Sequence, residues 1–195
     1  MLIPVVEQGL EKLLRDALPL PEHIGDVSFD PPSRTWAAQL SRVTVNLLLF
    51  GVGRSGQPPR ASGERIGPDG RVERRPPLPM VELNYLVSAW AGNVRDEHEL
   101  LGDVLSCIVT NQVLPSECLS VELPATVQIA LAPQDHGRAK DVFAAVDGSL
   151  RASFEIVVTT ALDGLDWHEV APRVERITAL AAPMPSSGAA STGTR

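Results

Sequence analysis

The feature that most constrains this chain is a pair of long apolar stretches, residues 43–52 and 78–91. The first reads VTVNLLLFGV and the second LPMVELNYLVSAWA, and both are rich in β-branched and large apolar side chains. Gly53 follows the first, whereas Pro77 and Gly92 flank the second. Strands that are apolar on both faces lie in a sheet that is covered on both sides. We therefore predict two central strands with other elements packed over them.

Helical periodicity predicts three helices around this sheet. Leucines recur at helical spacing within residues 3–18 and form one apolar face, and Pro19 stops the pattern. A second helix is expected to start at Asp96, which is a capping residue with Glu99 three positions later. Residues 139–146 predict a third, shorter helix.

Two further strands are expected, at residues 126–131 and 153–162, where apolar residues share one face. In the second apolar stretch, Trp90 is expected in the core or at its rim, and Tyr85 is expected to be buried with its hydroxyl hydrogen-bonded. Residues 174–180 fit either an edge strand or a short helix.

The order of these elements indicates one α/β (α+β) domain over residues 1–182, with a mixed β-sheet and two to three helices packed on it. Residues 183–195 are mostly Ala, Ser, Gly, Thr and Pro, so we expect a flexible C-terminal tail.

Residues 53–77 differ in character from the rest of the chain. They hold five glycines and five prolines with almost no large apolar side chain, which predicts a long exposed loop. One interpretation is a loop kept soluble by its charges. The other is a docking arm that orders against an acidic partner or a neighbouring copy, because guanidinium groups bind carboxylates bidentately. The candidate interface residues are Arg54, Arg60, Arg65, Arg71, Arg74 and Arg75.

Charge and composition exclude several classes of protein. The net charge of -7 argues against a nucleic-acid binder, which needs a basic face. Two cysteines are too few for a disulfide framework, and Cys107 lies on an apolar helical stripe, so we expect a buried free thiol and cytoplasmic folding. The first residues lack the basic region of a signal peptide, and the apolar stretches are too short to span a membrane.

Candidate catalytic residues are sparse. No nucleophile elbow, phosphate loop or dinucleotide fingerprint occurs. The tract from Asp96 to Glu99 contains His98, but adjacent helical residues point in different directions and do not converge on one ion. His98 and Cys107 are nine residues apart on one predicted helix, too far to touch. We therefore expect no enzyme, no cofactor and no metal site.

Three stretches together resemble one protein family. They are residues 76–90 (PPLPMVELNYLVSAW), the acid-then-Leu-Gly pattern of residues 97–102, and the helix–strand unit of residues 143–158. The family is the tail-terminator, or cap, proteins of extracellular contractile injection systems, which are phage-tail-like particles. The resemblance covers residues 3–162. This chain departs from the family at Phe143, where Trp is frequent, and in its arginine-rich segment.

The resemblance implies a non-enzymatic ring, of six copies, seated on the last layer of inner tube protein and sheath protein. Such a ring would assemble in the cytoplasm and would need exposed strand edges or arms, to which a sheath arm can add as a strand. Three alternatives stay open. They are a baseplate or tube-adaptor component, a regulatory protein-binding module that uses the arginines, and a small hydrolase or transferase that uses Asp96, Glu97 and His98.

Overall fold

A mixed five-stranded sheet forms the centre of the chain, in a computed structural model that describes residues 1–18, 24–133 and 138–170. The strand order is β1-β2-β5-β7-β6. β1 runs parallel to β2, and every other neighbouring pair is antiparallel. The strands are β1 (Gly25–Ser28), β2 (Val43–Arg54), β5 (Met80–Trp90), β6 (Gln128–Leu131) and β7 (Ser153–Ala161). The prediction of a mixed sheet is confirmed.

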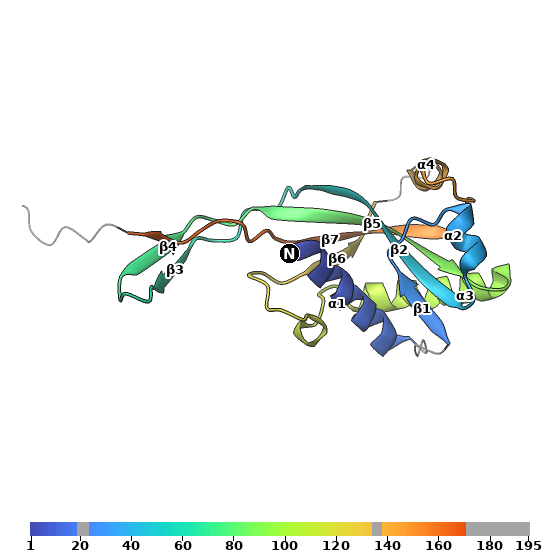
Figure 1. Cartoon of the computed structure of the whole chain (residues 1–195), viewed down its shortest axis with the longest axis horizontal. Helices are drawn as coiled ribbons and strands as arrows, with labels where there is room; N and C mark the ends of the chain where they lie inside the picture. Colours follow the sequence, from blue (N-terminus) through green and yellow to red (C-terminus); the bar gives the residue numbers. More distant parts are fainter. Residues whose placement is uncertain (19–23, 134–137, 171–195) are drawn as a thin grey trace, which may run out of the picture.

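Helices cover both faces of this sheet (Figure 1). One face carries α1 (Leu2–Ala17) and α3 (Val94–Thr110), and the other carries α2 (Arg34–Gln39) and α4 (Arg138–Ala145). A single 3-10 turn, η1 (Ser116–Cys118), contacts α1. The described residues thus hold four α-helices, where the sequence predicted two to three.

The core is divided between the two faces. The larger cluster joins the leucines of α1 and the inner residues of α3 to Val45, Leu47 and Tyr85 of β2 and β5. The smaller cluster lies under α2 and α4, where Leu48, Leu86, Trp90 and Phe143 are buried. Because β2 and β5 supply side chains to both clusters, they are apolar on both faces, as the sequence indicated.

A β-bulge interrupts the pairing of β2 with β5. The register shifts between Leu49, which lies opposite Tyr85, and Gly51, which lies opposite Asn84. The extra residue increases the local twist of the ribbon. Beyond it the two strands continue together to the pair of Arg54 with Val81, away from the helices.

Two predictions about polar groups in the body are wrong. The helix α3 begins at Val94, and its cap is Asn93, whose side-chain oxygen accepts the backbone N–H of Asp96 at 3.0 Å. Asp96 therefore lies inside the first turn, where a negative charge suits the helix dipole. Tyr85 is fully buried, but its hydroxyl has no hydrogen-bond partner in the part of the chain that the structure describes. Tyr85 is held by packing instead.

Other predictions about the body are confirmed or lie outside the described ranges. Trp90 is buried and its indole N–H donates to Ser88 at 3.0 Å. Cys107 is a buried free thiol. The short elements β1 and α2 were not predicted, because their few residues carry no clear periodicity. Residues 174–180 and 183–195 lie outside the described residues.

Candidate protein interface

The prediction of a loop over residues 53–77 is wrong, because this segment forms strands. β3 (Gly63–Ile66) and β4 (Val72–Arg75) make an antiparallel hairpin, and β8 (His168–Glu169) pairs with the outer side of β4. This three-stranded sheet extends from the body along the long axis of the molecule (Figure 1). We call residues 53–77 and 163–170 the arm.

The turn of the hairpin is set by local chemistry. The N–H of Gly67 donates to the carbonyl of Arg71 at 2.7 Å, and the N–H of Gly70 donates to the carbonyl of Gly67 at 3.0 Å. Gly70 has a φ of 81°, a conformation that glycine adopts without steric cost. The turn therefore holds β3 and β4 in a single register.

One face of the arm is stabilised by an aromatic ring between two cations. The guanidinium carbons of Arg65 and Arg75 lie 4.5 and 4.8 Å from the ring centroid of Trp167. Gly63 makes room for the ring, since a Cβ atom there would lie 2.9 Å from the Trp167 side chain. Arg65 also donates to Glu73 at 2.7 Å. Cation–π contacts and ion pairs on this face take the place of an apolar core.

The six candidate arginines do not form a bare basic patch. Arg71 donates to Glu169 at 2.7 Å and Arg75 to Asp163 at 3.0 Å. Arg74 pairs with Glu64, as Arg65 does with Glu73. Among the described residues, Arg54 and Arg60 have no ion-pair partner.

The arm differs from the predicted basic loop because its charges balance. Residues 53–77 hold six arginines and three acids, and residues 163–170 add three more acids. The complete arm therefore has no formal net charge, apart from its histidine. The sequence alone gave no sign that the two segments lie together.

The opposite face of the arm carries an apolar row that the sequence analysis missed. Ile66 lies directly opposite Val72, and the N–H of Val170 donates to the carbonyl of Val72 at 2.9 Å. Residues that lie opposite each other in a sheet share one face. These three side chains are 76%, 49% and 37% exposed. They form an uncovered apolar row across all three strands, which we call the arm row.

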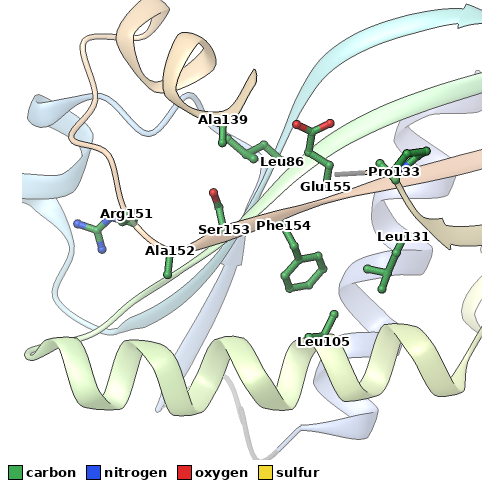
Figure 2. Close-up of a pocket in the computed structure, with 11 residues that line it drawn as sticks. Leu86, Leu105, Leu131, Pro133, Ala139, Arg151, Ala152, Ser153, Phe154 and Glu155 are labelled. Carbon is green, nitrogen blue, oxygen red and sulfur yellow. The ribbon is translucent and has the colours of Figure 1, made fainter. Parts of the chain in front are cut away.

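A second exposed apolar surface lies on the body, beside β6. Two cavities of about 420 and 520 Å³ adjoin this edge of the sheet and share Leu131 in their walls. Figure 2 shows the first, in which Leu105, Leu131 and Phe154 lie below β7. The side chains of Leu105, Val109, Val113 and Leu131, between 37% and 50% exposed, make up what we call the edge patch.

The edge patch follows from the geometry of α3. Leu105 and Val109 are one helical turn apart and therefore face the same side of the helix. Val113 comes just after α3 and makes an isolated bridge with Gln128 at the start of β6. Apart from that bridge, no described strand pairs with the outer side of β6. The sequence predicted β6 but gave no sign that it lies at an edge.

Two of the three residues considered for catalysis are engaged in structural contacts, and the third, His98, is exposed on α3. Glu97 accepts from Arg151 at 2.8 Å, and Asp96 accepts from the side chain of Asn93 at 2.7 Å. Burial raises the pKa of the thiols of Cys107 and Cys118, which keeps them protonated and weakly nucleophilic. Within the described ranges, no three His, Cys, Asp or Glu side chains are grouped so that they hold a metal ion. No helix in those ranges is long and apolar enough to cross a membrane.

Two solved structures have a fold similar to that of this chain. The chain matches a sheath/tube terminator of an extracellular contractile injection system (PVC) in the extended state, with a TM-score of 0.70 and 17% identity. It also matches the tube-terminating cap of the anti-feeding prophage, with a TM-score of 0.63 and 17% identity. These matches cover 96% and 90% of this chain, but only 66% and 60% of those chains. The chain thus spans less than two thirds of the length of either.

One family model matches most of the chain. No curated protein matches it. The model of the Pvc16 N-terminal domain matches residues 5–176, a range that includes the five-stranded sheet, the arm and the four helices except for the first three residues of α1. The chain therefore belongs to the Pvc16 N-terminal domain family.

Proposed function

We propose that this protein is a structural cap that ends the inner tube and the sheath of a contractile injection particle, at the end distal to the baseplate. The observation that carries the proposal is the fold match to a sheath/tube terminator over 96% of this chain. The match to a tube-terminating cap supports the same role. Both relatives are assembly proteins, and the role needs no catalytic group.

The cap acts as a closed ring of six copies, assembled in the cytoplasm on the last layer of tube and sheath protein. Two features support an assembly role. The arm row and the edge patch are both apolar and exposed, and exposed apolar surfaces of this kind mark protein interfaces. A ring repeats one contact between different surfaces of neighbouring copies.

Polar side chains of the body support a structural role over an enzymatic one. Arg151 is committed to Glu97 and stacks on Trp90, and Asn46 donates to the backbone of Ser28 and Asp30. Each of these groups joins two elements of the fold. Arg151 and Asn46 thus serve to hold the domain together.

The test of the proposed function is tube assembly. Purified tube subunits are polymerised with and without this protein, and tube lengths are measured by electron microscopy. We expect shorter, uniform tubes with one decorated end, whereas unchanged lengths and bare ends would contradict the proposal. Gold-labelled protein in complete particles separates a cap from a baseplate adaptor, because a cap is found only at the end away from the baseplate.

The arginines of the arm are tested separately. Because Arg71, Arg74 and Arg75 have partners within the arm, changing them perturbs the arm itself. The informative variant is R54E/R60E, which reverses two exposed cations with no ion pair in the described chain. We expect it to cap tubes less completely. The control is R95E, at an exposed position in the first turn of α3 that has no ion pair in the described chain.

A further inference from the structure

We infer that residues 163–170, which we call the strap, cover a binding site on the hairpin of β3 and β4. When the strap opens, this site takes an acidic, extended segment of a partner protein in the place of the strap. The site belongs to the arm of a single chain, so it does not depend on the proposed cap.

The strap is joined to the hairpin by few backbone bonds. Its strand β8 is two residues long and pairs with β4 over only two positions. One further bond follows, from the N–H of Val170 to the carbonyl of Val72. By contrast, β3 and β4 pair over four positions and are closed by their own turn. Because local opening starts where a segment has few contacts, the strap opens while the hairpin stays paired.

Side-chain contacts between the strap and the hairpin are mostly electrostatic. Arg71 pairs with Glu169 and Arg75 pairs with Asp163, and the acid of each pair is about half exposed. Trp167 adds its cation–π contacts with the hairpin. Exposed ion pairs weaken as salt screens them. The strap is therefore held by contacts that salt weakens and that other acidic groups can replace.

One pairing within this contact is unfavourable. Glu73 of β4 and Glu169 of β8 lie directly opposite each other. Two like charges at such positions repel each other. They are tolerated here because Arg65 donates to Glu73 and Arg71 donates to Glu169. The repulsion lowers the free energy that is needed to open the strap.

Without the strap, the hairpin presents a basic edge. Residues 53–77 hold six arginines and three acids, a formal charge of +3, whereas the strap holds three acids and no lysine or arginine. Arg75 has no ion pair with any other described residue. The outer edge of β4 is then unpaired, and extended peptides add to such edges through main-chain hydrogen bonds. The chemistry of the site thus selects an acidic strand.

The strap itself shows which segment fits this site. It is extended and acidic, and its Trp167 ring lies against Gly63, where a Cβ atom would be only 2.9 Å away. A partner segment of the same kind has carboxylates for Arg71 and Arg75 and an aromatic ring for the space at Gly63. Because a tethered segment has an effective concentration of about millimolar, the strap excludes weak or dilute competitors.

A disulfide that locks the strap tests the site. The pair of Val72 with Val170 is hydrogen-bonded, so the next pair, Glu73 with Glu169, is a non-hydrogen-bonded pair. The Cβ atoms of such pairs are close enough for a disulfide. The variant E73C/E169C therefore closes the strap when it is oxidised and releases it when it is reduced. Both native thiols are buried in the body.

The probe is a fluorescent peptide with the sequence of the strap, DGLDWHEV, whose binding is measured by fluorescence anisotropy at low ionic strength. We expect the reduced variant to bind this peptide and the oxidised variant to bind it at least about ten-fold more weakly. The control peptide NGLNWHQV has amides in place of the three acids. It should bind the reduced variant at least about ten-fold more weakly than the acidic peptide does.

Hydrogen exchange tests the opening in the unmodified chain. The rate of amide exchange in residues 163–170 should rise by about ten-fold between low salt and about 0.5 M salt, because screening weakens the ion pairs of the strap. Exchange in α1 and β5 should not change, since their contacts are apolar.

Equal binding of the peptide to oxidised and reduced E73C/E169C would overturn the acceptor site, because the peptide would then bind elsewhere. Absence of binding to both forms would overturn it as well. Strap exchange that ignores salt, or that changes together with the body, would overturn the separate opening of the strap. None of these results depends on tube length, so a failure of the proposed cap function leaves the strap intact.

Discussion

The guanidinium carbon of Arg151 lies 3.3 Å from the ring centroid of Trp90. The same guanidinium donates to Glu97 at 2.8 Å and to the carbonyl of Ala89 at 3.3 Å. Trp90 ends β5, Glu97 belongs to the first turn of α3, and Arg151 precedes β7. One side chain therefore joins three elements at the end of the body away from the arm.

Arg151→Ala is expected to lower the free energy of unfolding by about 2 kcal/mol, because it removes a cation–π contact and leaves Glu97 without its cation. Chemical denaturation measures the change. The control is Arg34→Ala, whose pair with Asp147 is exposed and worth less than about 1 kcal/mol. Equal effects of the two substitutions would show that Arg151 is only a surface cation.

Trp167→Ala is expected to loosen the arm without unfolding the body. The ring contacts Arg65 and Arg75, and its loss removes two cation–π contacts worth about 1 kcal/mol each. The rate of amide hydrogen exchange in residues 63–75 should then rise by about ten-fold or more, because the free energy needed to open the arm falls by about the energy of these contacts. Exchange in α1 and β5 should not change. Faster exchange throughout the chain would mean that the arm and body unfold together.

Phe143→Ala is expected to cost about 3–5 kcal/mol, the range for a buried aromatic residue. Phe143 is the one residue of α4 that is fully buried, and it packs with Leu48, Leu86 and Trp90. The control is Leu150→Ala, at a position that is 64% exposed, with an effect within about 0.5 kcal/mol. Thermal or urea unfolding measures both. A small loss for Phe143→Ala would indicate that α4 is not anchored to the sheet.

Stability is expected to fall at alkaline pH. Burial raises the pKa of Cys107 and Cys118, so the folded chain keeps these protons to higher pH than the unfolded chain. Their contribution is complete below the ordinary thiol pKa of about 8.5 and is lost as the pH rises through the folded values. The free energy of unfolding, measured across this range, checks the sign. Cys107→Ala should make the free energy of unfolding depend less steeply on pH in this range. An unchanged pH dependence would mean that groups other than Cys107 cause the loss of stability.

Most of the body was predictable from the sequence because its signal is local. The alternation in residues 153–162 and the leucine spacing in residues 3–18 each arise from one element that packs against one core. The cap of α3 was misplaced by three residues because Asn93 and Asp96 are both good capping residues. Which of the two residues caps the helix depends on where the preceding strand ends.

The arm was not predictable for a different physical reason. Its strands are stabilised by contacts between distant segments, such as Arg71 with Glu169 and Arg75 with Asp163. Read alone, residues 53–77 lack the apolar alternation that indicates a strand and show an excess of positive charge. The excess charge disappears when residues 163–170 are placed beside them, and it is the pairing with these residues that supplies the missing contacts. The sequence therefore gave the arginine-rich segment the wrong structure, and its role as a protein interface stays a prediction.

The continuity of β2 and β5 from the body into the arm has a mechanical consequence. The ladder between them extends from the pair of Thr44 with Trp90 to that of Arg54 with Val81, and the bridge between Arg60 and Leu78 follows in the same direction. Ladder hydrogen bonds lie across the strands. Residues 53–77 connect β2 to β5 and residues 163–170 follow β7, so a pull on the arm draws these three central strands in the same direction. The ladders that are then loaded in shear are those to the flanking strands β1 and β6, which together with the helices on both faces resist the force.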